Sequence, residues 1–177
     1  TMGTGGNSGI AAERKLKIIH VCGSPVSQYY SMISVHYARQ MLNGVKDCAQ
    51  TKAAFDFHFA VILPGGAWCM TTDLEQATID ATQRLTHGEA LSALASADYD
   101  ACVPHMFCWP GYTQYRSLFD LLGVPLVGCS AECMALITDK AQAKAVCAAS
   151  GVPVPEGELL RSPSQVPTLP FPFVLKP

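Results

Sequence analysis

Short apolar runs alternate with amphipathic stretches along the chain. Each run is rich in apolar and β-branched side chains and stops at a glycine or proline turn, which predicts a buried strand. These runs are residues 16–22, 55–63, 99–107 and 124–127. In the stretches between them apolar side chains recur every three or four residues, which predicts helices at 29–42, 71–86, 88–97 and 113–122. Such an alternation is typical of an α/β protein with a parallel sheet.

Capping residues indicate where two of these helices should begin. Either Ser27 or Ser31 can accept a hydrogen bond from the first turn of the helix at 29–42. Thr72 and Glu75 have the spacing of a capping box. We therefore expect helices to start close to these positions.

The last part of the chain has its own pattern. Ser130 can cap a helix whose apolar stripe continues until Gly151, and the prolines that follow prevent the helix from resuming. Two further segments, residues 155–160 (PEGELL) and 171–177 (FPFVLKP), are expected to form strands. This region therefore predicts one long helix followed by two strands.

Candidate binding residues follow the predicted strands. In open parallel sheets, ligands lie outside the carboxyl ends of the strands. The Gly23-Ser24-Pro25 turn could bind an anion through its backbone amides or could only reverse the chain. Arg116, near Gln114, could hold a carboxylate, or it could be a surface or capping arginine. Lys176 suits an anionic ligand such as phosphate, or it could only reach from the sheet edge to water.

Composition limits the classes of function. The 177 residues carry a net charge of -2, which leaves no basic surface for nucleic acid. Apolar residues make up 49%, but no run has the length that a bilayer crossing needs. There is no G-x-G-x-x-G pattern, so dinucleotide binding is not supported. These features indicate a soluble protein that binds neither nucleic acid nor membrane.

The cysteines and the first residues of the chain indicate the cellular compartment in which the protein is expected. None of the eight cysteines forms a Cys-x-x-Cys pair, and several lie in apolar segments, which favours reduced thiols in a reducing compartment. Residues 1–15 form a lead that is expected to be flexible, rich in glycine, serine and threonine at its start. We expect a cytoplasmic protein, with a plastid as the alternative if the lead is what remains of a transit peptide.

Several motifs together resemble the ATP-grasp ligases, and among them the D-alanine–D-alanine ligase-like group. The resemblance covers residues 16–177, and its carriers are CGSPVS, GVPLVG, the Asp139-Lys140 pair with Lys144, GVPVPEG and VLKP. Longer stretches, such as MFCWPGYTQYRSLFDLLGVP, are similar to the branch that joins an amino acid to mycosporine-glycine. The resemblance implies a Rossmann-like pre-ATP-grasp domain at 16–130 and the beginning of an ATP-grasp domain at 131–177.

The resemblance also implies a reaction and ligands. ATP phosphorylates an oxygen of one substrate, and an amine then displaces the phosphate. Lys140 and Lys176 match the two family lysines that contact ATP phosphates, and their charges would offset those of the polyphosphate. The Mg²⁺ that accompanies ATP needs oxygen ligands, and no acidic cluster with suitable spacing is present. We expect those ligands beyond residue 177, so the chain alone is expected to be inactive.

The sequence departs from the dipeptide ligases at two places. Ser27 stands where a substrate-orienting glutamate is expected, and Trp109-Pro110-Gly111-Tyr112 replaces a Gly-Glu-Asp-Gly stretch. These differences favour another acceptor, and the predicted substrate-binding residues are Gly23, Ser24, Ser27, Gln114 and Arg116.

Three functions remain open. The first is an ATP-dependent C–N ligase for an amino acid and mycosporine-glycine, and the second is a D-alanine–D-alanine or other dipeptide ligase. The third is a truncated, non-catalytic module that binds a small anion or a partner protein. For the ligases, the resemblance also allows a homodimer through the first domain.

Overall fold

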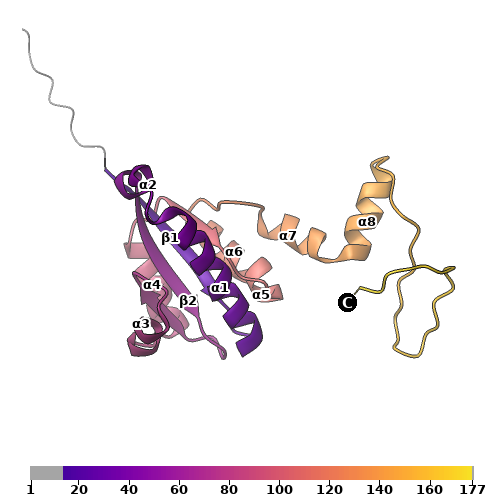
Figure 1. Cartoon of the computed structure of the whole chain (residues 1–177), viewed down its shortest axis with the longest axis horizontal. Coiled ribbons are helices and arrows are strands. Elements are labelled where there is room, and N and C mark those ends of the chain that lie inside the picture. The colour runs from indigo at the N-terminus through magenta and orange to yellow at the C-terminus, as the bar shows by residue number, and fades with distance from the viewer. Residues whose placement is uncertain (1–13, 177) are drawn as a thin grey trace, which may run out of the picture. The chain divides into compact units, whose positions relative to one another are not determined.

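A four-stranded sheet forms the centre of the first of two compact units. The structure is a computed structural model that describes residues 14–176. The strands are β1 (Leu16–Gly23), β2 (Phe55–Ile62), β3 (Trp68–Thr71) and β4 (Ala101–Pro104), in the order β3-β2-β1-β4. β1 pairs in parallel with β2 and β4, whereas β3 pairs antiparallel with β2. The expected α/β class with a largely parallel sheet is therefore confirmed (Figure 1).

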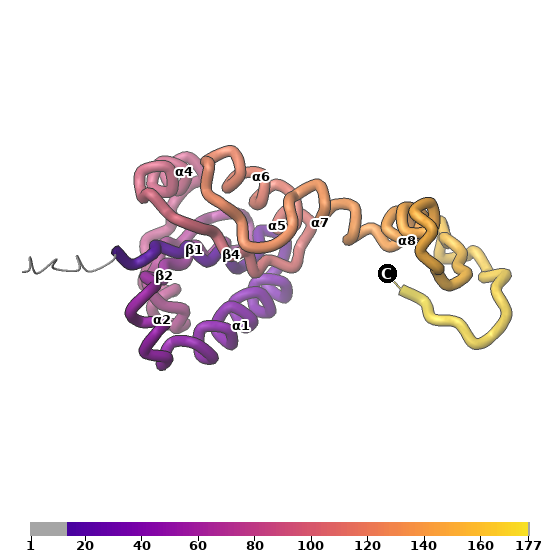
Figure 2. Tube along the Cα trace, turned by 90° about the horizontal axis from the view of Figure 1, so that it is seen from above, coloured from indigo at the N-terminus to yellow at the C-terminus, as the bar shows by residue number. Residues whose placement is uncertain are grey.

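Helices cover both faces of this sheet (Figure 2). On one face of the sheet, α1 (Gln28–Val45) and α3 (Gln76–Ala81) pack on the strand side chains that point to that face, including Cys22 and Phe59. On the other face α4 (His87–Ser96) and α6 (Gln114–Leu121) cover the alternate side chains of the same strands, including Ile19 and Val21. Successive strand residues point to opposite faces, so a run that is buried on both faces reads as continuously apolar.

Shorter helices complete this unit. They are α2 (Ala49–Ala54), which leads into β2, and α5 (Trp109–Tyr112), which follows β4. The Trp109-Pro110-Gly111-Tyr112 stretch, which replaces the family's Gly-Glu-Asp-Gly, is therefore helical. Gly111 is required there because a Cβ at this position would overlap the Cβ of Met106.

The predicted first strand, second strand and first helix are confirmed to within a few residues. Ser27 is the cap of α1, and its side chain accepts a hydrogen bond from the backbone N–H of Tyr30. Of the two candidate caps, Ser31 is instead buried inside the helix. The strand predicted at 99–107 is shorter than expected, since only Ala101–Pro104 pairs with β1.

The helix predicted at 71–86 is wrong over much of its length. The chain turns back after Gly65 and Gly66, so that β3 pairs antiparallel with β2, and only Gln76–Ala81 is helical. The capping box at Thr72 and Glu75 is also wrong. The capping box that forms joins Thr86 and Glu89 at the start of α4, where each side chain accepts a hydrogen bond from the other residue's backbone N–H.

The strand predicted at 124–127 is reduced to one bridge beside β4. Cys102 donates its backbone N–H to the carbonyl of Pro125 and accepts from the N–H of Val127, both at 2.8 Å. Pro125 has no N–H to donate, which limits how far such a pairing can extend.

The second compact unit begins at Glu132, directly after the first unit ends at Ala131. Its helices are α7 (Ala131–Thr138), whose first residue still belongs to the first unit, and α8 (Lys140–Ala149), where the sequence predicted a single helix. The break occurs at Asp139, which has an extended backbone. Its carboxylate caps α8 by accepting hydrogen bonds from the N–H groups of Ala141 and Gln142.

The two strands predicted at 155–160 and 171–177 are not formed in the part that the structure describes, residues 155–160 and 171–176. A strand needs a neighbour for its backbone hydrogen bonds, and no described residue from Glu132 to Lys176 lies in a ladder or is fully buried. The second unit is therefore made of helices and loops with exposed surfaces.

All eight cysteines are free thiols, as predicted. Cys22, Cys69, Cys102 and Cys108 are buried in the core, whereas the other four are exposed, so the expectation of core thiols holds for half of them. Among residues 14–176, no helix combines the length and the hydropathy that a bilayer crossing requires.

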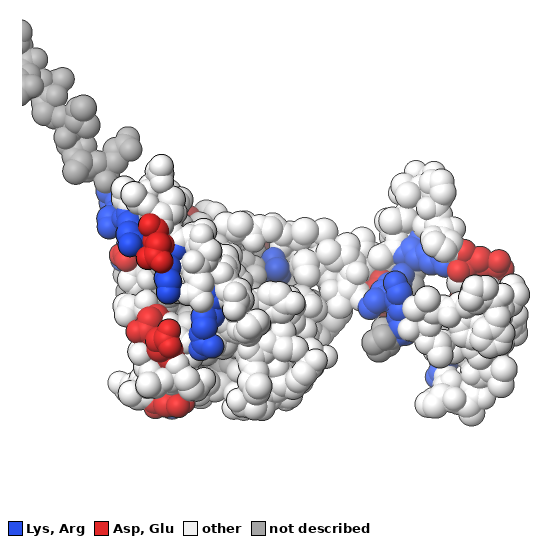
Figure 3. Space-filling view, viewed as in Figure 1, with Lys and Arg blue, Asp and Glu red and all other residues white. Residues whose placement is uncertain are grey.

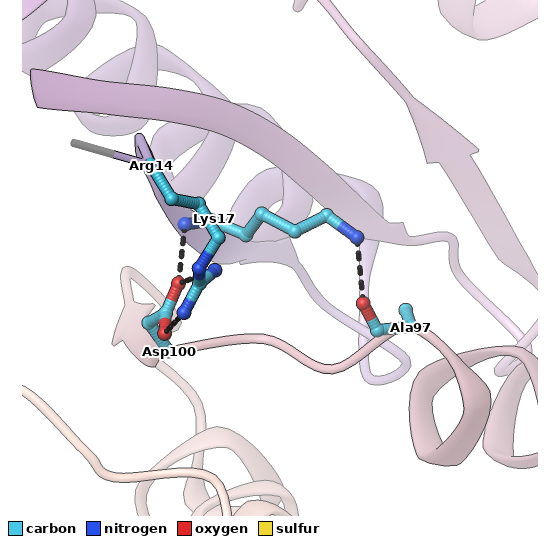
Figure 4. A network of polar contacts seen from close by, with 4 residues as sticks. All are labelled: Arg14, Lys17, Ala97 and Asp100. Carbon is cyan, nitrogen blue, oxygen red and sulfur yellow. Dashed lines mark hydrogen bonds and ion pairs between the residues drawn. The ribbon is translucent and has the colours of Figure 1, made fainter. Parts of the chain in front are cut away.

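A polar network fixes the amino-terminal ends of β1 and β4 (Figure 4). Arg14 donates two hydrogen bonds to the Asp100 carboxylate, at 2.9 and 2.7 Å, and the backbone N–H of Lys17 donates to the same group at 2.7 Å. The Lys17 ammonium donates to the carbonyl of Ala97 at 2.7 Å. Of the lead predicted to be flexible, residues 1–13 lie outside the described residues.

Candidate ligand-binding site

The turn after β1 is pressed tightly against the end of β2. Gly23 has φ +88°, and a Cβ at this position would overlap the carbonyl oxygen of Ile62. The backbone N–H of Ser24 donates to that same carbonyl at 2.8 Å. Only glycine allows both the positive φ and this close approach. Gly23 therefore holds the predicted binding turn at the carboxyl end of the central strand.

Ser24 and Ser34 fix the polar groups of this turn. The Ser24 side chain is fully buried and accepts a hydrogen bond from the N–H of Val26 at 3.1 Å. Ser34, on the inner side of α1, accepts from the N–H of Gly23 at 2.7 Å and donates to the carbonyl of His105 at 2.9 Å. One serine hydroxyl thus joins the turn after β1 to the segment after β4.

His105, whose carbonyl accepts the hydrogen bond from Ser34, also contacts a second histidine, His20. Nδ1 of His20 and Nε2 of His105 are 3.0 Å apart, and the rings stack with their centroids 5.3 Å apart. Phe57 and Phe59 pack against the ring of His20, which is 2% exposed. Burial, and to a smaller extent the nearby His105, lowers the pKa of His20 to about 3. Burial also lowers the pKa of His105 to about 4.

Both imidazoles are therefore neutral near pH 7. A neutral pair can share one N–H between its facing nitrogens, one donating and the other accepting. The two rings contact each other through a polar but uncharged interaction. Together with the hydrogen bonds of Ser34, this interaction can position the backbone of the turn, but it cannot neutralise the charge of an anion.

Arg116 reaches the loop that precedes the second unit. Its side chain on α6 is 8% exposed, and Nη1 donates to the carbonyl of Cys129 at 2.7 Å. Nε of Arg116 is buried and has no hydrogen-bond partner among the described residues. The surface-arginine alternative is thus wrong, since the guanidinium is buried and bonds a loop carbonyl. Its role toward a substrate stays a prediction.

The other predicted substrate residues have local partners. Gln114 begins α6, and its side-chain oxygen accepts a hydrogen bond from the Thr113 hydroxyl. The Ser27 hydroxyl is engaged in capping α1. The amino-terminal end of α1 and helix α5 lie at the same end of the sheet in the cartoon and in the tube view (Figures 1 and 2). The carboxyl ends of β1 and β4 also meet there, because these two strands are parallel.

Lys140 and Lys176, the predicted ATP-binding residues, both belong to the second unit. Lys140 is the first residue of α8 and directly follows the Asp139 cap. Lys176 is exposed at the end of the described chain. Their convergence on one polyphosphate stays a prediction.

A metal centre was not predicted within this sequence. Among residues 14–176, no three side chains of histidine, cysteine, aspartate or glutamate gather closely enough to hold a metal ion.

Sequence reasoning missed the His20–His105 pair and the bridging role of Ser34. The only sequence signal for His20 is its position within the apolar run LKIIHVC, where a polar side chain needs a buried partner. Nothing in the sequence identifies that partner, because His105 lies 85 positions away.

The chain is similar in sequence and in fold to D-alanine ligases. No protein-family model matches the chain. A D-alanine–D-alanine ligase of Vibrio campbellii is 27% identical over 138 residues, which are 77% of this chain and 38% of that protein. The chain thus spans well under half the length of this curated relative.

Solved structures agree in fold. The D-alanine–D-alanine ligase of Coxiella burnetii matches with a TM-score of 0.61 and 22% identity, over 86% of this chain and 47% of that one. The VanG D-Ala:D-Ser ligase of Enterococcus faecalis matches with a TM-score of 0.62 and 21% identity, over 81% and 44%. The α/β fold described above is therefore the fold found in part of these ligases.

Proposed function

We propose that the chain is the amino-terminal part of an ATP-dependent ligase of the D-alanine–D-alanine ligase type. The observation that carries this proposal is the sequence match to the Vibrio campbellii ligase over 77% of the chain. The shared fold and the resemblance of CGSPVS, the Asp139-Lys140 pair and VLKP to ATP-grasp motifs support it.

The proposed reaction has two steps. The γ-phosphoryl group of ATP is transferred to a carboxylate oxygen of the first amino acid, which forms an acyl phosphate and ADP. The amine of the second substrate then attacks the acyl carbon, loses a proton and displaces phosphate, so that a C–N bond forms. Catalysis of this kind depends mainly on positioning and charge neutralisation.

The residues of this chain would contribute binding and positioning. Lys140 and Lys176 would neutralise the phosphates of ATP, which needs permanent positive charge and no titration. The turn at Gly23 and Ser24, with Ser27, Gln114 and Arg116, would contact the first substrate. The Mg²⁺ that ATP chemistry requires would be held by residues other than those described.

A second candidate is the ligation of an amino acid to mycosporine-glycine. It is favoured by Ser27, which stands where the dipeptide ligases are expected to have a substrate-orienting glutamate, and whose hydroxyl here caps α1. A neutral hydroxyl at this place would not hold the ammonium group of D-alanine. In this reaction ATP would phosphorylate the ring oxygen of mycosporine-glycine before the amine displaces phosphate.

Phosphate release from ATP by the full-length protein separates these candidates. Release with D-alanine as the sole amino acid substrate is expected for the dipeptide ligase. Release only with mycosporine-glycine plus serine would replace that assignment by the second candidate. If neither mixture releases phosphate while a small anion still binds, the non-catalytic module is the correct function.

The roles of the two lysines have a separate test. Lys140→Met or Lys176→Met should weaken binding of an ATP analogue by at least about tenfold, since each removes one charge from the phosphate site. Unchanged affinity in both variants would contradict their assignment. The homodimer stays a prediction, to be checked by the mass of the full-length protein in solution.

A further inference from the structure

The second unit contains a lysine whose position is set by a glycine. Lys144 lies on α8, one helical turn after Lys140, so the two side chains share one face of the helix. Its Nζ lies directly against Gly157, within 3.0 Å of the point that a Cβ would occupy. Its Cε and Cδ lie 3.6 and 4.0 Å from the same point. The ammonium group therefore occupies the space that a side chain at residue 157 would fill, and this space is called the recess below.

This ammonium has no anionic partner within the described chain. Lys144 is partly buried and makes no hydrogen bond or ion pair with any described residue. Glu156, which directly precedes Gly157, is exposed and makes no ion pair with Lys144 among the described contacts. Two other acids near in the sequence are engaged elsewhere. Asp139 caps α8, and Glu158 accepts hydrogen bonds from the backbone and side chain of Thr168 and from Gln165.

The ammonium of Lys144 lies against the backbone of Gly157 and has no counterion among the described residues, so nothing there compensates for water that this contact displaces. Surface lysines normally avoid this cost by extending their heads into water. Lys144 is instead bent against the backbone of Gly157. Figure 3 shows several Lys and Arg side chains of this unit close together on the face in view, with acidic side chains directly beside them. An anion bound at this face would satisfy the charge of Lys144.

We propose that Lys144, positioned by Gly157, is a third cation of the polyphosphate site, beside Lys140 and Lys176. This inference rests on the proposed function, which names only Lys140 and Lys176 as phosphate-binding residues. It adds Lys144 and the recess at Gly157. Lys144 contacts the phosphates of the nucleotide, and Gly157 acts only through Lys144.

Gly157 offers an unusually direct test. Its φ is not in the left-handed region, so alanine is compatible with the backbone. The added methyl group would meet only the flexible end of Lys144. Gly157→Ala should therefore leave the fold intact while moving one ammonium group.

The experiment measures binding of inorganic tripolyphosphate to the 177-residue chain by titration calorimetry. Lys144→Met should weaken binding by about tenfold and Gly157→Ala by about fivefold, since the first removes the charge and the second displaces it. Matched controls are Lys46→Met, which removes an exposed lysine of the other unit, and Gly44→Ala, where a Cβ meets nothing within 4 Å. Both controls should bind as the parent does.

The double variant tests whether Gly157 acts through Lys144. If it does, Lys144→Met with Gly157→Ala should bind no more weakly than Lys144→Met alone, because the methyl group then has no ammonium to displace. Additive losses would show that Gly157 affects the site in another way and would overturn its positioning role.

The outcomes separate this inference from the proposed function. Unchanged binding in Lys144→Met, together with losses in Lys140→Met and Lys176→Met, overturns only the third cation. Losses in Lys144→Met and Gly157→Ala alone would support the recess and contradict the roles of the other two lysines. No binding of tripolyphosphate by the parent chain would overturn the inference.

Discussion

His20 occupies an interior position of the central strand, where its imidazole is enclosed by Phe57, Phe59 and His105. These surroundings favour the neutral ring. The folded pKa values, about 3 for His20 and about 4 for His105, lie below the ordinary value of 6.5. At pH values between the folded pKa values and 6.5, the unfolded chain therefore binds more protons at these histidines than the folded chain does. This part of the stability is complete above about pH 6.5 and is lost as the pH falls toward 4 and 3.

The free energy of unfolding should therefore decrease on acidification, by up to about 1.4 kcal/mol per pH unit for each histidine in this range. Urea unfolding at several pH values between 7.5 and 4.5 measures this slope. His20→Asn removes one of the two groups and should reduce the slope, whereas the exposed His36→Asn should not. Equal slopes in all three proteins would contradict the assignment.

The Ser34 hydroxyl accepts the hydrogen bond from the N–H of Gly23 and donates one to the carbonyl of His105. Ser34→Ala leaves the N–H of Gly23 without its acceptor in a buried position. We expect a loss of about 1–3 kcal/mol in the free energy of unfolding, the usual cost of an unsatisfied buried donor. The control is Ser31→Ala, because Ser31 is buried on the same helix and its hydroxyl makes no such bond. A similar loss in both variants would show that volume and not hydrogen bonding is responsible.

At the level of single residues, some roles could be predicted from sequence and others could not. Ser27 was a predictable cap because its partner lies three positions away. Gly23 was a predictable turn residue, but its contact with the carbonyl of Ile62 depends on the pairing of β1 with β2. Partners that are far apart in sequence, such as His20 and His105, become visible only after the strands are ordered.

Among the elements, long periodic segments were predicted well and short ones were not. β3 has only four residues, and its pairing depends on the reversal at Gly65 and Gly66. Asp139 divides the helix predicted at 130–151, although the apolar stripe continues across it. An aspartate can extend a helix or start a new one, and local hydrogen bonding decides between them.

Asp139→Ala should destabilise α8 at its first turn. The carboxylate accepts from the N–H groups of Ala141 and Gln142, and loss of such a cap costs about 1 kcal/mol. Hydrogen exchange at these two amides should become faster, and Asp139→Asn should restore most of the protection. Because Lys140 follows the cap directly, the same variant should weaken tripolyphosphate binding. Unaltered exchange at both amides would show that Asp139 does not hold the helix end.

The whole chain divides into a unit with a core and a unit without one. Residues up to Ala131 form the sheet and both core clusters, whereas no described residue from Glu132 to Lys176 is fully buried. Backbone hydrogen bonds with few apolar contacts around them open easily. The domain boundary that the family resemblance implies at 130–131 stays a prediction. The absence of strands among the described residues 155–160 and 171–176 was not predicted.

Limited proteolysis of the intact chain should therefore cut first between residues 132 and 176. A fragment that retains the sheet should accumulate, with its unfolding transition close to that of the intact chain. Addition of tripolyphosphate should slow these cuts, since a ligand that binds the folded unit stabilises it. First cuts within β1, β2 or β4 would contradict the division.

The bridge between β4 and the segment around Pro125 has a consequence for solubility. β4 is the last strand on its side of the sheet, and its outer backbone groups would otherwise be open to any extended peptide. The two hydrogen bonds at Cys102 occupy that edge, and the proline provides no donor from which a further ladder could grow. A short segment that fails to become a strand thus prevents one molecule from recruiting the next into an aggregate.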